Sequence, residues 1–134
     1  MLNLEFRSSH PYDNDENGIL VPITLKLGKE QVSFDAKLDT GAQHCLFQRE
    51  YGEMLGLKVD QGQRLVFNTV NSPVIAFGHQ ISMEVLDLDF DLFVYFYEDA
   101  AINRSLLDRT GWLSKVRLGL VDYDSLIFLS HYDD

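Results

Sequence analysis

The sequence predicts an all-β protein with one or two short helices, formed by a single domain over residues 1–134. Three observations carry this prediction. Apolar and polar residues alternate along most of the chain, which is the period of a half-buried strand. Turn-forming residues separate these segments. Only residues 47–55 have the spacing of an amphipathic helix. The length suits one domain, and 46% hydrophobic with 24% charged residues is typical of a globular fold.

The first part of the chain is expected to contain three strands. Alternation predicts a short strand over residues 2–6 and longer strands over 19–27 and 32–38. Residues 28–30 supply the turn of a hairpin between the two longer strands. Pro22 has no amide hydrogen, so we expect it at a sheet edge or at the beginning of a strand.

The rest of the chain indicates one helix and further strands. The helix over 47–55 is expected to end at Gly56, because glycine is common just after a helix C-terminus. Residues 64–97 indicate three or four strands, interrupted by a polar break and a turn. The mixed pattern over 103–115 is compatible with a short helix, and residues 116–129 indicate two strands joined by a turn.

Charge and composition exclude several kinds of partner. The net charge of -10 argues against a nucleic-acid surface and an anionic membrane surface, because both need clustered lysine and arginine. No stretch reaches the roughly 20 apolar residues of a membrane span. The start of the sequence lacks a signal-peptide pattern, so we expect a cytoplasmic protein. Cys45 is the only cysteine and the histidines lack ligand spacing, so no metal or cofactor is expected.

The segment Asp39-Thr40-Gly41-Ala42 is the most informative about chemistry. An apolar strand delivers the Asp39 carboxylate into a tight turn, in which Gly41 permits close approach of a partner group. The Thr40 hydroxyl is expected to bond to backbone groups and lock the turn. A carboxylate held rigidly between apolar neighbours suits general acid–base catalysis on water. The competing interpretation is that these residues form only a polar turn.

This segment, followed by a short helix and by Leu-Gly-Leu at 55–57, resembles the retropepsin-like aspartic proteases, which comprise retroviral-type proteases and their bacterial relatives. A second similar segment covers residues 105–129. The family pattern there is two apolar residues, a glycine and an arginine before a short helix. Leu106, Leu107 and Arg109 match that pattern.

The resemblance implies a fold, an activity and a partner. The fold is a closed, acid-protease-type β-barrel with a single lobe, half of a pepsin-like protein. The activity is that of an aspartic endopeptidase in which two facing aspartates activate one water, with Asp39, Thr40 and Gly41 as the catalytic residues. Close carboxylates cannot both ionise, so they share one proton. Because the chain has one such motif, the second aspartate must come from another copy, which implies a homodimer acting on a protein or peptide.

The resemblance also implies where substrate binds. Residues 68–76 fall where the family has its flap, a hairpin that holds an extended peptide by β-augmentation. Other contacts are implied for residues beside the catalytic loop. The implied substrate-binding residues are Ala42, Val70, Asn71, Ser72, Pro73, Leu107 and Arg109.

Other hypotheses rest on departures from this pattern. Asp108 stands where glycine is usual, and Pro73 makes the flap tip stiffer than a glycine-rich one. Both favour a catalytically silent retropepsin-fold module for dimerisation or peptide binding. His44 and Cys45 as a thiol nucleophile pair is a weaker hypothesis, because adjacent strand residues point to opposite faces. Residues 13–18 match the first half of an EF-hand loop, but the bidentate glutamate at the twelfth position is missing, which favours an acidic turn.

Overall fold

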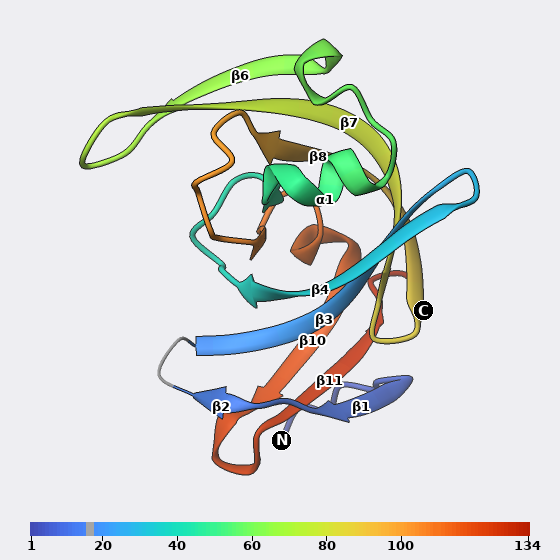
Figure 1. Cartoon of the computed structure of the whole chain (residues 1–134). Coiled ribbons are helices and arrows are strands. Elements are labelled where there is room, and N and C mark those ends of the chain that lie inside the picture. The colour runs from blue at the N-terminus through green and yellow to red at the C-terminus, as the bar shows by residue number, and fades with distance from the viewer. Residues whose placement is uncertain (16–17) are drawn as a thin grey trace.

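A mixed eight-stranded sheet, closed into a ring, forms most of the protein (Figure 1). The structure is a computed structural model that describes residues 1–15 and 18–134. The strand order is β2-β3-β4-β9-β5-β8-β7-β6, and a further pairing of β3 with β7 closes the ring. The strands of this sheet are β2 (Asn14–Asp15), β3 (Gly18–Leu27), β4 (Glu30–Leu38), β5 (Leu46–Phe47), β6 (Gln63–Asn68), β7 (Pro73–Val85), β8 (Leu88–Tyr97) and β9 (Leu106–Leu107).

The first hairpin, β3 and β4, agrees with the pattern in the sequence. Gly28 lies in its turn with a φ of +59°, a conformation that glycine adopts without strain. Along β4, Val32 and Ala36 are buried while their neighbours are exposed. Pro22 pairs with Asp35 on β4, and the pairing of β3 with β7 begins one residue later. Pro22 therefore lies where its missing amide hydrogen costs no ladder bond on the β7 side.

The ring closes because β7 is long enough to pair with three strands. It pairs with β8 over residues 76–85, with β6 over 73–78 and with β3 over 82–85. The far part of the β6–β7 hairpin projects away from the ring (Figure 1). Residues 64–97, expected to form three or four strands, form the three strands of this meander.

One short α-helix, α1 (Arg49–Met54), lies across the ring and contacts β4 and β8 (Figure 1). Gly56 follows it with a φ of +83°, which confirms the predicted end of the helix. The helix begins two residues later than predicted, because Phe47 belongs to β5 and is fully buried. A Cβ on Gly52 would lie 3.0 Å from the Phe96 ring, so glycine allows the close packing of α1 on β8.

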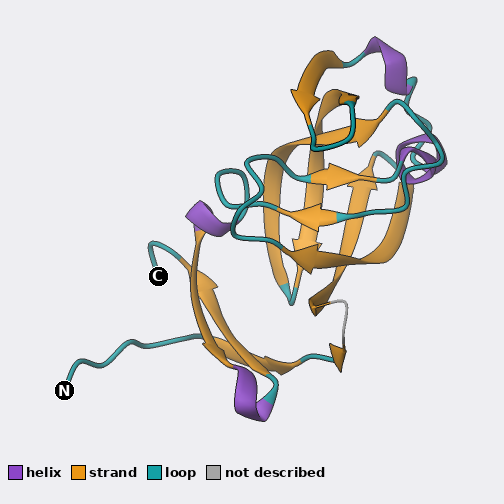
Figure 2. Ribbon diagram, turned by 90° about the vertical axis from the view of Figure 1, so that its left-hand side faces the viewer, coloured by secondary structure: helices purple, strands orange, loops and turns teal. Residues whose placement is uncertain are grey.

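A separate three-stranded sheet lies beside the ring (Figure 2). Its order is β1-β11-β10, and its strands are β1 (Ser8–Pro11), β10 (Val116–Val121) and β11 (Leu126–His131). One face packs against the ring, because Ile127 and Leu129 are buried in the main core. The β10–β11 turn contains a 3-10 helix over Asp122–Asp124, which confirms the two strands and the turn expected over 116–129.

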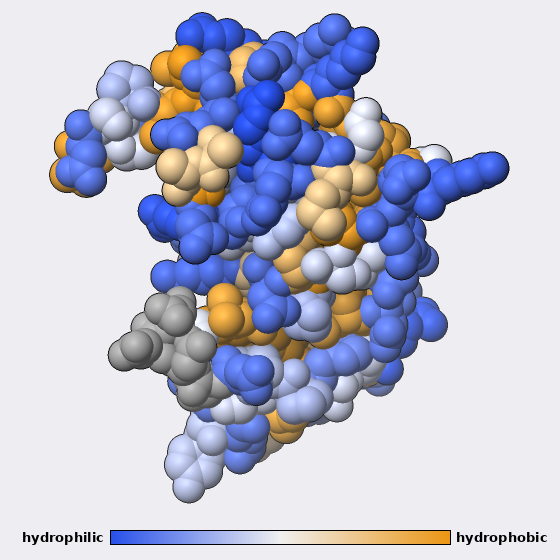
Figure 3. All heavy atoms as spheres, in the orientation of Figure 1, coloured by the Kyte–Doolittle hydropathy of each residue, from blue (hydrophilic) through white to orange (hydrophobic). Residues whose placement is uncertain are grey.

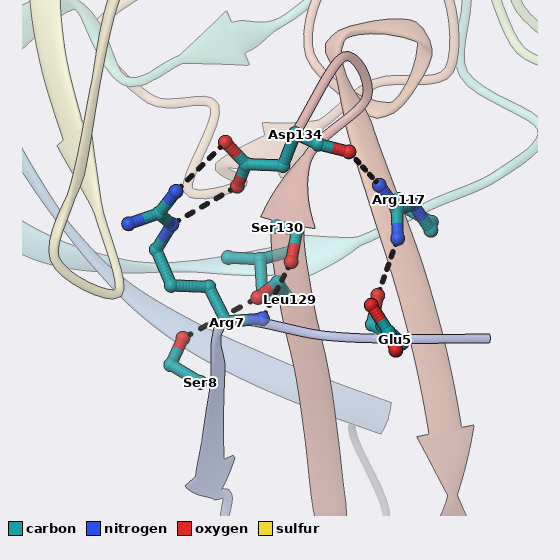
Figure 4. A network of polar contacts seen from close by, with 7 residues as sticks. All are labelled: Glu5, Arg7, Ser8, Arg117, Leu129, Ser130 and Asp134. Atoms are coloured by element: carbon teal, nitrogen blue, oxygen red, sulfur yellow. Dashed lines mark hydrogen bonds and ion pairs between the residues drawn. The ribbon is translucent and has the colours of Figure 1, made fainter.

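The N-terminal strand starts later than expected. Residues 2–6 are not in a strand, and Leu2 and Leu4 are exposed. The ladder with β11 begins only at Ser8, because a different set of contacts holds the preceding residues. Arg117 donates to the Glu5 carbonyl, and Arg7 donates two hydrogen bonds, each 3.0 Å long, to the carboxylate of the C-terminal residue, Asp134 (Figure 4).

Residues 103–115 also differ from the expected short helix. Leu106 and Leu107 form β9, and only Leu113–Lys115 are helical, as a 3-10 turn. Leu106 and Leu107 belong to the sheet and not to a helix, because β9 pairs with β4 and with β5. No helix among residues 1–15 and 18–134 is long and apolar enough to span a membrane.

Two apolar clusters fill the interior. The larger lies inside the ring and includes the fully buried Trp112. The smaller lies near the β6–β7 hairpin and consists of Leu46, Ala76, Tyr95, Tyr97 and Leu106, with partly buried apolar residues packed around it.

Candidate active site

The candidate site is a loop, residues 39–45, that crosses from β4 to β5. These two strands are consecutive in the sequence, but β9 lies between them in the sheet. The loop must therefore pass the end of β9. The parallel pairing of Leu38 with Leu107 brings the beginning of the loop directly to that end.

Three hydrogen bonds hold the loop against the end of β9 and the residues that follow it. The Asp39 amide donates to the Leu107 carbonyl at 3.0 Å, and the Arg109 amide donates to the Ala42 carbonyl at 2.9 Å. The Thr110 hydroxyl donates to the Gln43 carbonyl. Both ends of the turn are thus fixed to one neighbouring segment, which restricts the positions that the Asp39 carboxylate can take.

Within the turn, the Asp39 side chain bonds to its own backbone. The Gly41 amide donates to Asp39 Oδ1 at 2.9 Å, and the Ala42 amide donates to the Asp39 carbonyl at 3.2 Å. A Cβ on Gly41 would lie 3.3 Å from the same carboxylate oxygen, so glycine gives it room. Thr40 is exposed, and the locking of the turn by its hydroxyl stays a prediction.

A cavity of about 560 Å³ lies between this loop and the β6–β7 hairpin. Asp39, half-buried, is one of its lining residues. The cavity wall joins the loop, the hairpin, β5 and β9, and part of it belongs to the smaller apolar cluster. Its lining residues are Asp39, Gly41, Ala42, Gln43, His44, Leu46, Phe67, Asn68, Thr69 and Leu106.

The implied substrate-binding residues are only partly brought together. Ala42 lines this cavity, whereas Val70, Asn71, Ser72 and Pro73 line a second cavity of about 600 Å³ at the end of the hairpin. Its other wall includes Glu98, Asp99, Ile102 and Arg104. Figure 3 shows the end of the hairpin standing clear of the body of the protein.

Leu107 and Arg109 do not line the Asp39 cavity. Leu107 is fully buried in the main core, and Arg109 is exposed; both act on the loop through backbone atoms. The prediction missed Leu46, Phe67 and Leu106 as lining residues. For Leu106, the signal was present in the sequence, because adjacent residues of a strand face opposite sides and only one of the pair 106–107 can face the core.

The tip of the hairpin is closed by Thr69. Its hydroxyl donates to the Ser72 carbonyl at 2.7 Å and accepts from the Ser72 amide at 3.2 Å. A backbone bond from the Thr69 amide to the Ser72 carbonyl, at 3.1 Å, completes the turn. Together with Pro73 at the first position of β7, these contacts agree with the stiff tip expected from the sequence.

His44 and Cys45 point to different surroundings. The His44 ring lies edge-on to the Tyr95 ring, 4.9 Å between centroids, and lines the cavity. Cys45 is buried and donates from its thiol to Asp108 at 3.1 Å. Burial, followed by the nearby Asp108 charge, raises the pKa of the Cys45 thiol well above its usual value. A thiolate nucleophile is therefore disfavoured.

Among residues 1–15 and 18–134, no three His, Cys, Asp or Glu side chains are arranged to hold a metal ion. The EF-hand alternative over 13–18 includes residues 16 and 17, which lie outside the described residues.

Comparison with known proteins agrees with this geometry. A family model described as "Aspartyl protease" matches residues 21–108. A retropepsin-like aspartic protease from Rickettsia conorii has a similar structure, with a TM-score of 0.62 and 16% identity over 96% of this chain and 97% of that one. The retroviral protease-like domain of Ddi1 from Leishmania major matches with a TM-score of 0.55 and 21% identity, over 86% of this chain and 96% of that one. No curated protein sequence matches significantly.

Proposed function

The chain belongs to the retropepsin-like aspartyl protease family, and from this premise we propose that it is an aspartic endopeptidase active as a homodimer. The observation that carries the proposal is the place of Asp39. Its carboxylate is held on a braced turn and lines a cavity whose other wall comes from the β6–β7 hairpin. A rigid carboxylate beside a peptide-sized space is what water activation requires.

The proposed chemistry needs two copies of Asp39. One carboxylate, in its ionised form, takes a proton from a water molecule as that water attacks the peptide carbonyl. The other, in its protonated form, donates its proton to the carbonyl oxygen. These transfers give a tetrahedral intermediate with two hydroxyl groups. As its C–N bond breaks, the first aspartate donates the proton it took to the leaving nitrogen. The second aspartate takes a proton from one hydroxyl, which leaves a carboxylic acid and returns both aspartates to their starting state. In this proposal Thr40 and Gly41 shape the turn, and no covalent intermediate forms.

Peptide binding in this proposal uses both walls of the cavity. The hairpin offers backbone groups to an extended peptide, which gives binding that does not depend on the peptide sequence. Phe67, Leu46 and Leu106 offer apolar surface to one of its side chains. Residues 70–73, at the tip, then cover the substrate from the outer side.

We assign the contact with the second copy to the three-stranded sheet. Among the residues that the structure describes, its edge strands, β1 and β10, each pair only with β11. At the end of β10, Leu120 and Val121 are 43% and 40% exposed, and Tyr123 in the following turn is almost fully exposed. An unpaired edge strand beside exposed apolar side chains is suited to strand pairing with a symmetric partner.

The decisive experiment compares Asp39→Asn with the parent on casein and on a peptide library. Asparagine keeps the size of aspartate but cannot take a proton from water, so cleavage should be lost while circular dichroism and melting temperature are retained. Asp87→Asn, in the β7–β8 turn, changes the same charge at an exposed site away from the cavity and should cleave like the parent.

Two results contradict the proposal. Cleavage by Asp39→Asn at the parent rate would exclude Asp39 as the catalytic group. If the parent cleaves nothing and pepstatin produces no thermal shift, the catalytically silent dimerisation or peptide-binding module is the better account. A pepstatin shift in the parent that disappears in Asp39→Asn supports a formed two-aspartate site.

A further inference from the structure

Asp108 is buried directly behind the Asp39 loop, with only 1% of its surface exposed. Its carboxylate nevertheless has partners on both oxygens. The Trp112 amide and the Cys45 thiol donate to Oδ1 at 2.7 and 3.1 Å. The Gly111 amide donates to Oδ2 at 2.5 Å, and the Thr110 hydroxyl lies 3.5 Å from the same oxygen. A buried carboxylate needs such compensation, and here backbone amides supply most of it.

The residues after Asp108 are shaped to its side chain. The Leu113 amide donates to the Asp108 carbonyl at 3.1 Å, so the chain turns around the carboxylate. A Cβ on residue 111 would lie 2.6 Å from Asp108 Oδ2, which only glycine avoids. Asp108 and Gly111 are therefore matched to each other, and Asp108 caps the turn that leads to Trp112.

The neighbours of Asp108 in the chain are the ones that hold the Asp39 loop. Leu107, on one side, accepts from the Asp39 amide, and Arg109, on the other, donates to the Ala42 carbonyl. The Cys45 thiol ties the far end of the same loop to the Asp108 carboxylate. A shift of Asp108 would therefore move the contacts at the beginning, middle and end of the loop together.

We propose that Asp108 is the positioning residue for the Asp39 loop, acting through the turn that it caps and through the Cys45 thiol. A glycine, the usual residue in the family pattern at this position, has no side chain to make these four contacts. The sequence suggested that this departure favours a silent module, whereas the contacts indicate that the loop is braced by it. The consequence for catalysis rests on the proposed function; the positioning itself does not.

Amide hydrogen exchange tests the positioning without any substrate. In Asp108→Asn, one of the two carboxylate oxygens is replaced by an NH2 group, which cannot accept a hydrogen bond. One of the two bonds from the Gly111 and Trp112 amides is therefore lost. We expect the Asp39 and Arg109 amides to exchange about 10- to 100-fold faster, while the amides of β7 and β8 keep their rates. Faster exchange confined to Gly111 and Trp112 would overturn the proposal, as would a uniform increase throughout the protein.

Cys45 variants provide a milder and independent test, which remains available if Asp108→Asn does not fold. Cys45→Ala removes the donor and should raise the exchange of the Asp39 amide by about 2- to 10-fold. Cys45→Ser keeps a donor at this site and should restore the parent rate. If alanine and serine behave alike, the thiol contact has no positioning role and the proposal fails in that part.

Kinetics then separate this inference from the proposed function. Misplacement of Asp39 should lower kcat by about 10- to 100-fold in Asp108→Asn and leave KM nearly unchanged, because the cavity wall is intact. A raised KM with the parent kcat would contradict a positioning role. If the parent itself cleaves no substrate, the proposed function fails, whereas the exchange measurements still decide whether Asp108 positions the loop.

Discussion

Leu106 and Leu107 face opposite apolar clusters from adjacent positions on β9. Leu106 lines the cavity beside Asp39 as part of the smaller cluster, whereas Leu107 is fully buried in the main core. The carbonyl of Leu107 also accepts from the Asp39 amide. A strand of two residues therefore connects the packing of the core to the position of the candidate catalytic carboxylate.

Dimer formation should depend on salt and on the three-stranded sheet. Each chain carries a net charge of -10, so two chains repel each other and salt should tighten the dimer by screening. Val121→Asp places a further charge at the exposed end of β10 and should shift sedimentation toward the monomer. Met54→Asp adds the same charge at an exposed position of α1 and should leave the dimer intact. Only monomer for the parent at high protein and high salt concentration would contradict this prediction.

Activity should follow a bell-shaped pH profile with an optimum below neutral pH. Two facing carboxylates share one proton, so both the fully protonated and the fully ionised pair lack one of the required groups. The measurement is kcat/KM against pH on one peptide substrate. A rise toward alkaline pH that thiol reagents abolish would indicate Cys45 chemistry instead.

The sequence predicts those parts of the fold in which a regular apolar pattern continues over many residues or a turn-forming residue such as glycine marks the end of an element. The β3–β4 hairpin, the end of α1 at Gly56 and the β10–β11 hairpin are all found as expected. The elements β5 and β9 escape prediction because two residues carry no measurable period. Alternation over residues 2–6 is misleading, because a strand also needs a partner strand. The ladder with β11 begins at Ser8, opposite Leu129, and β11 ends two residues further on, at His131.

The candidate site, like the fold, could be predicted from the sequence only in part. The Asp-Thr-Gly motif marks Asp39 from the sequence, because the residue types and their neighbours carry the signal. The cavity wall does not follow from the motif, because Phe67 lies on β6, far from Asp39 in the sequence, and only the fold brings both residues to one cavity. The role of Asp108 is also invisible in the sequence, since its hydrogen-bond partners come from the fold of a turn and from a thiol 63 residues away.

A more flexible tip of the β6–β7 hairpin should weaken substrate binding while changing the stability of the fold only slightly. Thr69→Val removes two hydrogen bonds to Ser72, so the tip must lose more conformational freedom when it covers a peptide. We expect a KM several-fold higher with a nearly unchanged kcat. Thr24→Val is the matched control, because it also breaks an exposed hydroxyl contact, with Ser33 at 2.8 Å, outside the cavity. Equal effects of the two variants on KM would contradict a role of the hairpin tip in binding.

The Cys45 thiol should be unreactive in the folded protein. Burial and the adjacent Asp108 charge raise the pKa of Cys45, so very little thiolate is present at the slightly alkaline pH used for labelling. Ellman's reagent should therefore react slowly with the native chain and stoichiometrically after unfolding in guanidinium. Immediate stoichiometric reaction under native conditions would show that the loop behind Asp39 opens readily.

The ion pair between Arg7 and Asp134 should stabilise the folded protein only above the acidic pH range. The hydrogen bond from Arg7, followed by its charge, holds the pKa of Asp134 below its usual value. A carboxyl whose pKa is depressed in the folded state contributes stability above its unfolded pKa of about 3.9 and loses it as pH falls through the folded value. Asp134→Asn should therefore melt slightly below the parent at neutral pH, and the difference should vanish in strong acid. Asp133→Asn changes the same charge one residue earlier and should melt like the parent at both pH values. A difference between Asp134→Asn and the parent that persists unchanged into strong acid would mean that the carboxylate of Asp134 does not form the stabilising contact with Arg7.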